Sequence, residues 1–273
     1  MRFGEAVLLA DANVPGGWLL EVDGVPQSYV HPDDPEYLEF AYVQLIADVV
    51  ELSAPTGEPL TVLHLGGGGC TLPRYVAHTR PGSTQLVIEA DDLLVELVRR
   101  ELGTTGFRLK VGDARTSLAG LRPASSDLVI SDVFAGAQLP VDCTTLEYVE
   151  QVRALLRPAG TYIANLADGP PLQFVRGQVA TVLAAFPHVV LLADPAVLRG
   201  RRFGNVVLAG SDRPFDAAAL ARRAARAAGR ARVVLDDEAR AFAGGAHPVT
   251  DRDAAQAPLP PIALFARRAG SGP

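Results

Sequence analysis

The chain has 273 residues, of which 48% are hydrophobic and 21% charged, a composition that suits a folded protein with a sizeable core and excludes a disordered chain. Its net charge of −6 argues against a nucleic-acid partner, because phosphate binding needs a basic face. No apolar stretch reaches the roughly 18 residues of a membrane span, and the first residues lack the apolar run of a signal peptide. We therefore expect a soluble, cytoplasmic protein with no membrane partner.

Metal-binding residue types are few and scattered. Cys70 and Cys143 are too few for a disulfide framework or a four-cysteine zinc site. The histidines show no metal-ligand spacing, and we expect no metal; they are His31, His64, His78, His188 and His247.

The N-terminal region combines extended and helical patterns. Two short apolar runs, AVLLAD and GWLLEVDG, flank the turn-forming ANVPGG and predict a β-hairpin. Apolar residues at spacings of three and four predict an amphipathic helix from Pro35 to Leu52, with Asp33 and Asp34 available as caps.

Short apolar runs then alternate with helical stretches near 71–79, 91–102, 144–157 and 171–186. This alternation predicts an α/β fold: a Rossmann-like, mostly parallel sheet with helices on both faces, beside the small N-terminal hairpin region. The strands we expect are TVLHLG, QLVIEAD, FRLKVGD, DLVISD, TYIANLAD, HVVLLAD and FGNVVLAG.

The C-terminal part, from 212 to 273, is expected to be a helical extension with a frayed tail, RRAGSGP. Within it, ALARRAARAAGRARVV (219–234) carries five arginines interleaved mostly with alanine. Such a pattern is typical of a solvated helix face, although a binding face has the same composition. The divisions that we expect are 1–54 for the hairpin and the amphipathic helix, 55–211 for the Rossmann-like core, and 212–273 for the C-terminal extension and tail.

Candidate ligand-binding residues follow successive predicted strands. They are the glycines Gly66 to Gly69, then Glu89, then the GDA of 112–114, then Asp132. In an open α/β sheet, ligands bind beyond the carboxyl ends of the strands. Glycines let a nucleotide-like ligand approach the backbone, an acid after the second strand can accept both ribose hydroxyls, and an acid after the third can accept an adenine amino group.

Each feature alone also fits a structural role, with glycines in tight packing and acids as helix caps. Together they favour nucleoside binding, because Glu89 lies about 20 residues after the glycines, where a ribose-binding acid is expected. The dinucleotide pattern G-x-G-x-x-G fails, since frames from Gly66 and Gly67 end at Thr71 and Leu72. S-adenosylmethionine (AdoMet) is thus favoured over NAD, and an NAD-dependent oxidoreductase is the disfavoured alternative.

Four segments resemble the spermidine synthase (aminopropyltransferase) group of AdoMet-methyltransferase-like folds, in particular its divergent bacterial members. VLHLGGGGCTLPR, VIEADDLLVELVRR, KVGDARTSL and SDLVISDVFAGAQLP are similar to the glycine turn, ribose segment, adenine segment and acid loop of that group. VDGVPQSYV and PEYLEFAYVQLI resemble its N-terminal hairpin and gate helix. The resemblance covers roughly residues 17–211.

The resemblance implies a role for each candidate residue. Gly66 and Gly68 would face the methionine part of AdoMet or decarboxylated AdoMet, Glu89 the ribose, and Asp113 the adenine. Asp132 would help to deprotonate an attacking amine. The alternative is a purely structural role, in which Asp132 caps its own loop. The residues expected at the cofactor are Gln27, Gly66, Gly68, Glu89, Asp113 and Ala114, with Asp132 as the catalytic residue.

The chain departs from the polyamine-making members at the positions of several acids. A second acid three residues after Asp132 is replaced by Ala135, and an acid within the glycine turn is replaced by Gly69. The Tyr-His-Glu of the gate helix reads Tyr42-Val43-Gln44. These departures argue against putrescine as acceptor and against decarboxylated AdoMet as donor.

The function we infer is a spermidine-synthase-like transferase that aminopropylates or methylates a small-molecule acceptor other than putrescine. A non-catalytic nucleoside-binding or assembly protein that keeps the fold is the alternative. A homodimer is compatible with this interpretation.

Overall fold

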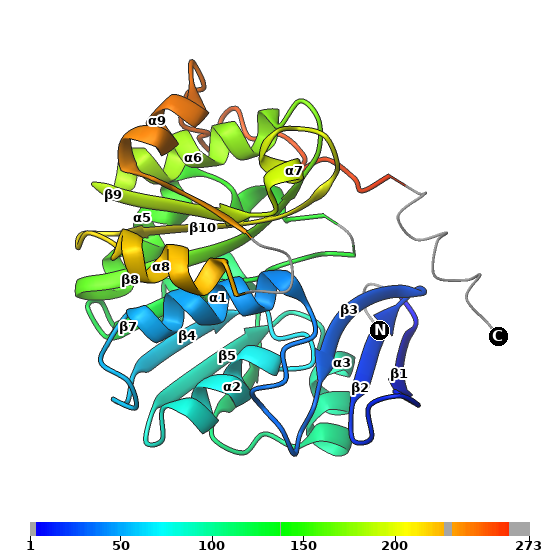
Figure 1. Cartoon of the computed structure of the whole chain (residues 1–273). Helices are drawn as coiled ribbons and strands as arrows, with labels where there is room; N and C mark the ends of the chain where they lie inside the picture. The colour runs from blue at the N-terminus through cyan, green and yellow to red at the C-terminus, as the bar shows by residue number, and fades with distance from the viewer. Residues whose placement is uncertain (1–3, 137, 227–230, 262–273) are drawn as a thin grey trace.

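The structure is a computed structural model that describes residues 4–136, 138–226 and 231–261. Two sheets form its framework, and Figure 1 shows the smaller one beside the lower part of the larger. The small sheet is antiparallel, in the order β1-β2-β3, and packs through Leu20 on helix α3 and the edge of the large sheet. Its strands are β1 (Ala6–Ala10), β2 (Trp18–Val22) and β3 (Val25–Val30).

The large sheet confirms the predicted fold class. Its order is β11-β9-β10-β8-β7-β4-β5-β6, and the strands are parallel except at β10 and β11, which run antiparallel to their neighbours. All seven predicted strands are present in it. Its members are β4 (Thr61–Leu65), β5 (Thr84–Glu89), β6 (Arg108–Val111), β7 (Ser126–Ser131), β8 (Leu156–Asp168), β9 (His188–Ala193), β10 (Gly204–Ser211) and β11 (Arg232–Leu235).

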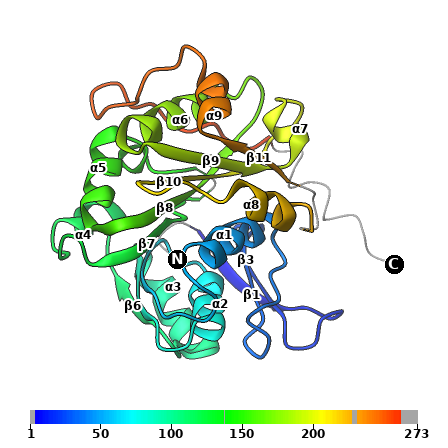
Figure 2. The same ribbon diagram turned by 60° about the vertical axis from the view of Figure 1, so that its left-hand side comes forward.

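Helices cover both faces of this sheet, which is why its strands are apolar on both sides. One apolar cluster joins α4, α5, α6 and α9 to one face, and another joins α1, α2 and α8 to the opposite face (Figure 2). The helices are α1 (Ala41–Leu52), α2 (Thr71–Thr79), α3 (Asp92–Leu97), α4 (Ala114–Leu118), α5 (Leu146–Leu155), α6 (Gln173–Ala185), α7 (Pro195–Leu198), α8 (Ala217–Ala224) and α9 (Asp236–Ala243), with a π-helical turn at Val98–Leu102 and a 3-10 turn at Val141–Cys143.

The helix predicted from Pro35 begins only at Ala41. The preceding residues are held by tertiary contacts instead: the ring of Tyr37 lies 5.6 Å from that of Tyr29, and the side chain of Gln44 donates to the carbonyl of Leu38. The N-cap, Phe40, has no side-chain capping bond, so Asp33 and Asp34 do not cap this helix. The prediction was therefore six residues too long at its start.

The Ala/Arg-rich stretch 219–234 is not one helix. Helix α8 ends at Ala224, and residues from Arg232 form strand β11, which pairs with β9 at the edge of the sheet. Burial of Val234 in the core outweighs the helical propensity of its alanine-rich surroundings. Arg223 contacts Asp48 on α1 at 3.4 Å. The expected frayed tail lies outside the described residues.

Among the described residues, no helix is both long and apolar enough to cross a membrane.

Candidate functional site

A cavity of about 840 Å³ opens where β4 and β7 end side by side. At this point the chain order reverses, because β5 and β6 extend the sheet on one side of β4 while β7 and β8 extend it on the other. Such a switch point leaves a crevice between the two following loops, and ligands of α/β sheets bind there. The seven predicted site residues all line this one cavity; they are Gln27, Gly66, Gly68, Glu89, Asp113, Ala114 and Asp132.

The glycine turn between β4 and α2 is packed by the protein itself at two positions. Gly66 has φ +83°, and a Cβ atom there would lie 2.2 Å from the main-chain oxygen of Asp132. A Cβ atom on Gly69 would lie 2.5 Å from the side chain of Val30 on β3. At Gly68, by contrast, the nearest atoms to an added Cβ belong to Ser28, at 3.6 Å. Contacts within the protein thus explain the glycines at positions 66 and 69, and Gly66, Gly67 and Gly68 border the cavity.

Glu89, at the end of β5, is held by the backbone of this turn. Its Oε2 accepts from the amide of Gly67 at 2.8 Å and from that of Gly68 at 3.4 Å, and its Oε1 accepts from the amide of Asp91 at 3.0 Å. A carboxylate offers about four acceptor sites, so it can keep these bonds and still accept from a ligand hydroxyl. The carboxylate therefore has a fixed position on the cavity wall.

Asp113 is the N-cap of α4. Its Oδ1 accepts from the amide of Thr116 at 2.8 Å and from the Thr116 hydroxyl at 2.9 Å. The capping role that an acid after a strand commonly has is therefore present here, on a side chain that also borders the cavity. The neighbouring Ala114 is buried beside it.

Asp132 lies at the end of β7, half-buried on the cavity wall. Its Oδ1 accepts from the amide nitrogen of Asn165 at 2.8 Å, and its Oδ2 accepts from the hydroxyl of Tyr42 at 3.3 Å. Burial raises the pKa of the Asp132 carboxyl, an effect that the two hydrogen bonds oppose and the charge of Glu89 reinforces. The group is thus a better proton acceptor than an exposed aspartate.

Asn165 on β8 and Asn205 on β10 extend this network, and the sequence reasoning missed both. The side-chain nitrogen of Asn205 donates to the Asn165 side-chain oxygen at 3.0 Å. The sequence did contain a signal for these two residues, because each asparagine lies within a mostly apolar predicted strand. Buried polar side chains are normally hydrogen-bonded, so an asparagine in such a strand indicates a partner nearby.

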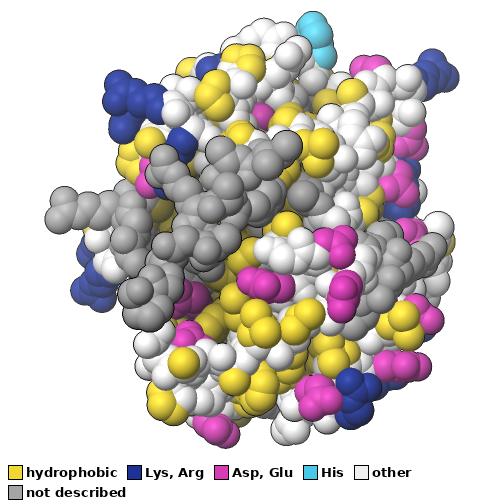
Figure 3. Space-filling view, turned by 90° about the vertical axis from the view of Figure 1, so that its right-hand side faces the viewer, with side chains coloured by type: hydrophobic (Ala, Val, Ile, Leu, Met, Phe, Trp, Pro, Cys, Tyr) yellow, Lys and Arg dark blue, Asp and Glu magenta, His cyan; other side chains and the backbone are white. Residues whose placement is uncertain are grey.

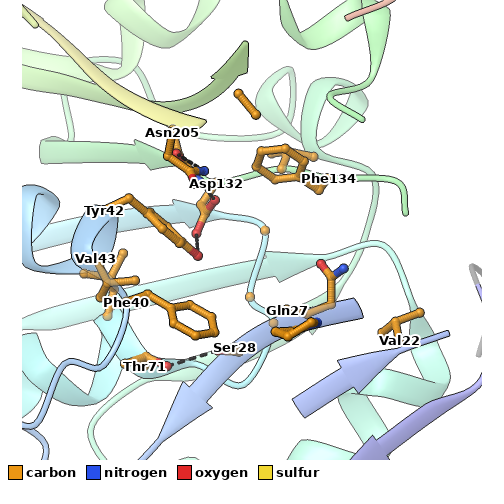
Figure 4. A pocket seen from close by; sticks show the side chains of 18 of the residues that line it. Val22, Gln27, Ser28, Phe40, Tyr42, Val43, Thr71, Asp132, Phe134 and Asn205 are labelled. Atoms are coloured by element: carbon orange, nitrogen blue, oxygen red, sulfur yellow. Dashed lines mark hydrogen bonds between the residues drawn. The ribbon is translucent and has the colours of Figure 1, made fainter. Parts of the chain in front are cut away.

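The opposite wall comes from the small sheet and the start of α1. Figure 4 shows the Gln27 side chain directed from β3 into the cavity, with the Phe40 ring on the same wall, nearer to α1. The hydroxyls of Ser28 and Thr71 are 3.1 Å apart, and Thr71 also donates to the main-chain oxygen of Tyr29 at 2.8 Å. These bonds tie β3 to the first turn of α2 and so fix the small sheet over the glycine turn.

The lining of the cavity is acidic. Among the described lining residues Arg202 is the only lysine or arginine, and it pairs with Asp194 at 2.9 Å. Burial lowers the pKa of His64 to about 4, so this side chain adds no positive charge near neutral pH. Figure 3 shows acidic side chains spread over the visible part of the face that carries the small sheet. Cationic ligands are favoured by the acidic lining residues, which are Glu21, Glu39, Glu89, Asp91, Asp113, Asp132 and Asp194.

The two positions where this chain lacks an acid of the polyamine-making members, Ala135 and Gly69, differ in their surroundings. Ala135 is exposed and borders the cavity, on the loop that follows Asp132. Gly69 has no room for a side chain beside Val30. Within the parts of the chain that the structure describes, no group of three or more histidine, cysteine or acidic side chains is arranged to hold a metal ion.

A comparison with solved structures identifies a relative that matches most of the chain. The crystal structure of a probable spermidine synthase from Corynebacterium glutamicum is 36% identical, with a TM-score of 0.85, and the match covers 90% of this chain and 92% of that one. The chain belongs to the spermidine synthase-like family. The spermidine synthase of Thermotoga maritima, at 18% identity and a TM-score of 0.55 over 76% of this chain and 69% of that one, shares the fold.

Other relatives are more distant. A polyamine aminopropyltransferase of Vibrio vulnificus is 28% identical over 142 residues, which are 50% of this chain and 46% of that protein. An N-terminal histidine N-methyltransferase of Emericella nidulans is 25% identical over 219 residues, which are 75% of this chain and 38% of that protein. The chain spans about half or less of the length of the curated relatives it matches. No family model matches it.

Proposed function

We propose that this spermidine synthase-like protein is a transferase that uses AdoMet or decarboxylated AdoMet to alkylate a small nucleophilic acceptor. The observation that carries the proposal is the placement of Asp132, a half-buried carboxylate with a raised pKa, in the same cavity as the glycine turn and Glu89. Membership of the family and the aminopropyltransferase and methyltransferase relatives support this reaction class.

The nucleoside end of the cavity fits such a cofactor. Glu89 would accept the ribose hydroxyls from a carboxylate that the turn already holds in place. Gln27 reaches in from the small sheet, and Asp113 with Ala114 would border the adenine. Gly68 brings backbone to the cavity surface without a side chain. The acidic lining suits the positive charge of a sulfonium.

At the acceptor end, Asp132 would receive a proton or hold an ammonium group. An amine attacks only when neutral, so a carboxylate within hydrogen-bond reach that binds a proton readily promotes the reaction. The sulfonium group, when bound, supplies a carbon open to in-line displacement. Asn165 and Tyr42 orient the Asp132 carboxylate, and the cavity walls position the acceptor.

The acceptor we propose is not putrescine. A diamine has a second ammonium, which needs an acid if it is to lose its water at acceptable cost. Ala135 offers no such group, and the Gly69 position is filled by Val30. These two positions also favour the second candidate function, a nucleoside-binding protein without turnover, because they affect acceptor binding and leave the nucleoside end intact.

Calorimetry with AdoMet, decarboxylated AdoMet, methylthioadenosine and NAD tests the proposal. We expect binding of at least one of the first three and none of NAD; binding of NAD alone would overturn it. Incubation with a panel of amines followed by mass spectrometry then separates the reactions. Methylthioadenosine as product indicates aminopropyl transfer, and S-adenosylhomocysteine indicates methyl transfer. Tight cofactor binding with neither product across the panel supports the non-catalytic candidate.

A further inference from the structure

Three neighbouring strands place a row of polar side chains beside the cavity. The parallel register of β7 and β8 pairs Ser131 with Ala164, so the next residues, Asp132 and Asn165, lie side by side. The antiparallel register of β8 and β10 pairs Asn205 with Ala167, two residues beyond Asn165. Since side chains alternate between faces, Asn205 and Asn165 are diagonal neighbours on one face. The sheet itself therefore sets the order Asp132, Asn165, Asn205.

The orientation of the Asn165 amide depends on both neighbours. An asparagine side chain has nearly the same shape in two orientations, which differ in whether nitrogen or oxygen points to a given side. An ionised Asp132 can only accept, so it requires the nitrogen of Asn165, and the bond is 2.8 Å long. The Asn165 oxygen then faces Asn205, which donates to it at 3.0 Å. With 1% of its surface exposed, Asn165 has little access to water as a substitute donor.

We propose that Asn205 is a positioning residue for Asp132: by donating to Asn165 it fixes the Asn165 amide with its nitrogen toward the carboxylate. Oδ1 of Asp132 is thereby engaged, and Oδ2, whose one hydrogen bond from the described residues is the longer 3.3 Å bond from Tyr42, is the oxygen left to meet an acceptor. This inference rests on the proposed function, because it assigns Oδ2 of Asp132 as the atom that accepts the proton in the proposed reaction.

Other groups around Asp132 do not depend on Asn205. Tyr42 approaches from α1, Glu89 acts through its charge from the end of β5, and the turn after β4 contributes the backbone of Gly66. Asn165 is the residue that bonds to both Asp132 and Asn205, so we expect a change at Asn205 to reach Asp132 through Asn165. If the amide turned its oxygen toward the carboxylate, the ionised form would lose a donor and face a partial negative charge.

The chain contains three asparagines, Asn13, Asn165 and Asn205, so their side-chain amide signals can be followed separately in asparagine-labelled protein by NMR. In the wild type the Asn165 signal should move with pH as Asp132 ionises, and Asp132→Asn should abolish that movement. In Asn205→Leu we expect the pH midpoint of the Asn165 signal's titration to rise by about half a pH unit or more, or the signal to stop moving with pH. The matched control is Asn13→Leu, in an exposed loop, which should leave the Asn165 titration unchanged.

The same midpoint and amplitude in Asn205→Leu as in the wild type would overturn the proposal. If the leucine variant does not fold, Asn205→Ala, which only removes atoms, provides the same comparison. The titration needs no ligand, so its result is separate from the calorimetry: a protein that fails to bind AdoMet contradicts the proposed function, whereas an unmoved Asn165 titration contradicts the role of Asn205.

Discussion

The main-chain oxygen of Asp132 occupies the space that a side chain on Gly66 would need, with only 2.2 Å between that oxygen and an added Cβ. The amide of Asp132 donates to the carbonyl of Leu65 at 2.9 Å, and the amide of Gly66 donates to that of Ile88 at 2.8 Å. The glycine turn and the acid loop are thus locked together by backbone contacts, so the first glycine sets the position of the proposed catalytic residue.

Replacing Gly66 by alanine should therefore destabilise the protein by roughly 2–4 kcal/mol, the sum of a left-handed backbone penalty and a steric clash. Urea unfolding measures this directly. The control is Gly57→Ala, because Gly57 has a similar φ of +78° but no atom of the described residues lies within 4 Å of an added Cβ. The control should lose only about 1–2 kcal/mol. Equal losses in the two variants would show that the contact with Asp132 is unimportant.

Glu89→Gln should weaken nucleoside binding at least tenfold, because two charge-assisted bonds, each worth roughly 1.5–3 kcal/mol, are reduced. The amides of Gly67 and Asp91 also lose a carboxylate partner, so a lower melting temperature should accompany the loss of affinity. Calorimetry measures the affinity on protein shown to be folded. The exposed Glu96→Gln on the neighbouring helix α3 is the control and should bind normally. Unchanged affinity in Glu89→Gln would remove this residue from the site.

Asp132→Asn should lower turnover by roughly 10²- to 10⁴-fold with little change in cofactor affinity, because the amide keeps the shape of the side chain but cannot take up a proton. The measurement is turnover per folded molecule with an acceptor found by the screen, beside calorimetry with AdoMet. Normal turnover in this variant would contradict the catalytic role and leave Asp132 as a structural residue of its loop.

The pH dependence of stability gives a second test of Asp132. Because burial raises its pKa, the folded protein binds the proton more tightly than the unfolded chain. The contribution of Asp132 to the free energy of unfolding is therefore fully present below its pKa in the unfolded chain, and it is lost as the pH rises through its pKa in the folded protein. Asp132→Asn should thus gain stability relative to the wild type from about pH 4 upward.

The control for this pH test is Asp253→Asn, which should show the opposite slope. Hydrogen bonds from Thr250 lower the pKa of Asp253, so its contribution to stability is present above the unfolded-chain pKa and lost as pH falls through the folded-state pKa. Urea unfolding curves at several pH values measure the free energy of unfolding of both variants and of the wild type. Parallel slopes for the two variants would contradict the raised pKa of Asp132.

Ala135→Asp should increase the affinity for putrescine severalfold, while the wild type should form little or no spermidine from it. The introduced acid lies three residues after Asp132 on the cavity rim and can hold a second ammonium. Ala135→Asn, which adds the same volume without charge, is the matched control and should not bind putrescine better. Efficient spermidine formation by the wild type would show that another acid in the cavity holds the distal amine.

The sequence by itself determined the elements of the core and the positions just after its strands. Apolar runs of strand length and helical spacing are local patterns, and the carboxyl ends of parallel strands meet at one edge, so Glu89, Asp113 and Asp132 could be assigned to one cavity before their contacts were known. The same local reasoning failed where distant residues compete with propensity, as at the late start of α1 and in strand β11.

Only the tertiary structure decided what surrounds those positions. The register between β8 and β10 joins Asn205 to Asn165, and the packing of Val30 against Gly69 leaves no space for an acid at that position of the glycine turn. Both contacts connect residues far apart in the chain, and their distances depend on sheet order and strand register. A local pattern indicates that a residue is buried or lies at a strand end, but the partner it meets there is fixed by the packing of the whole fold.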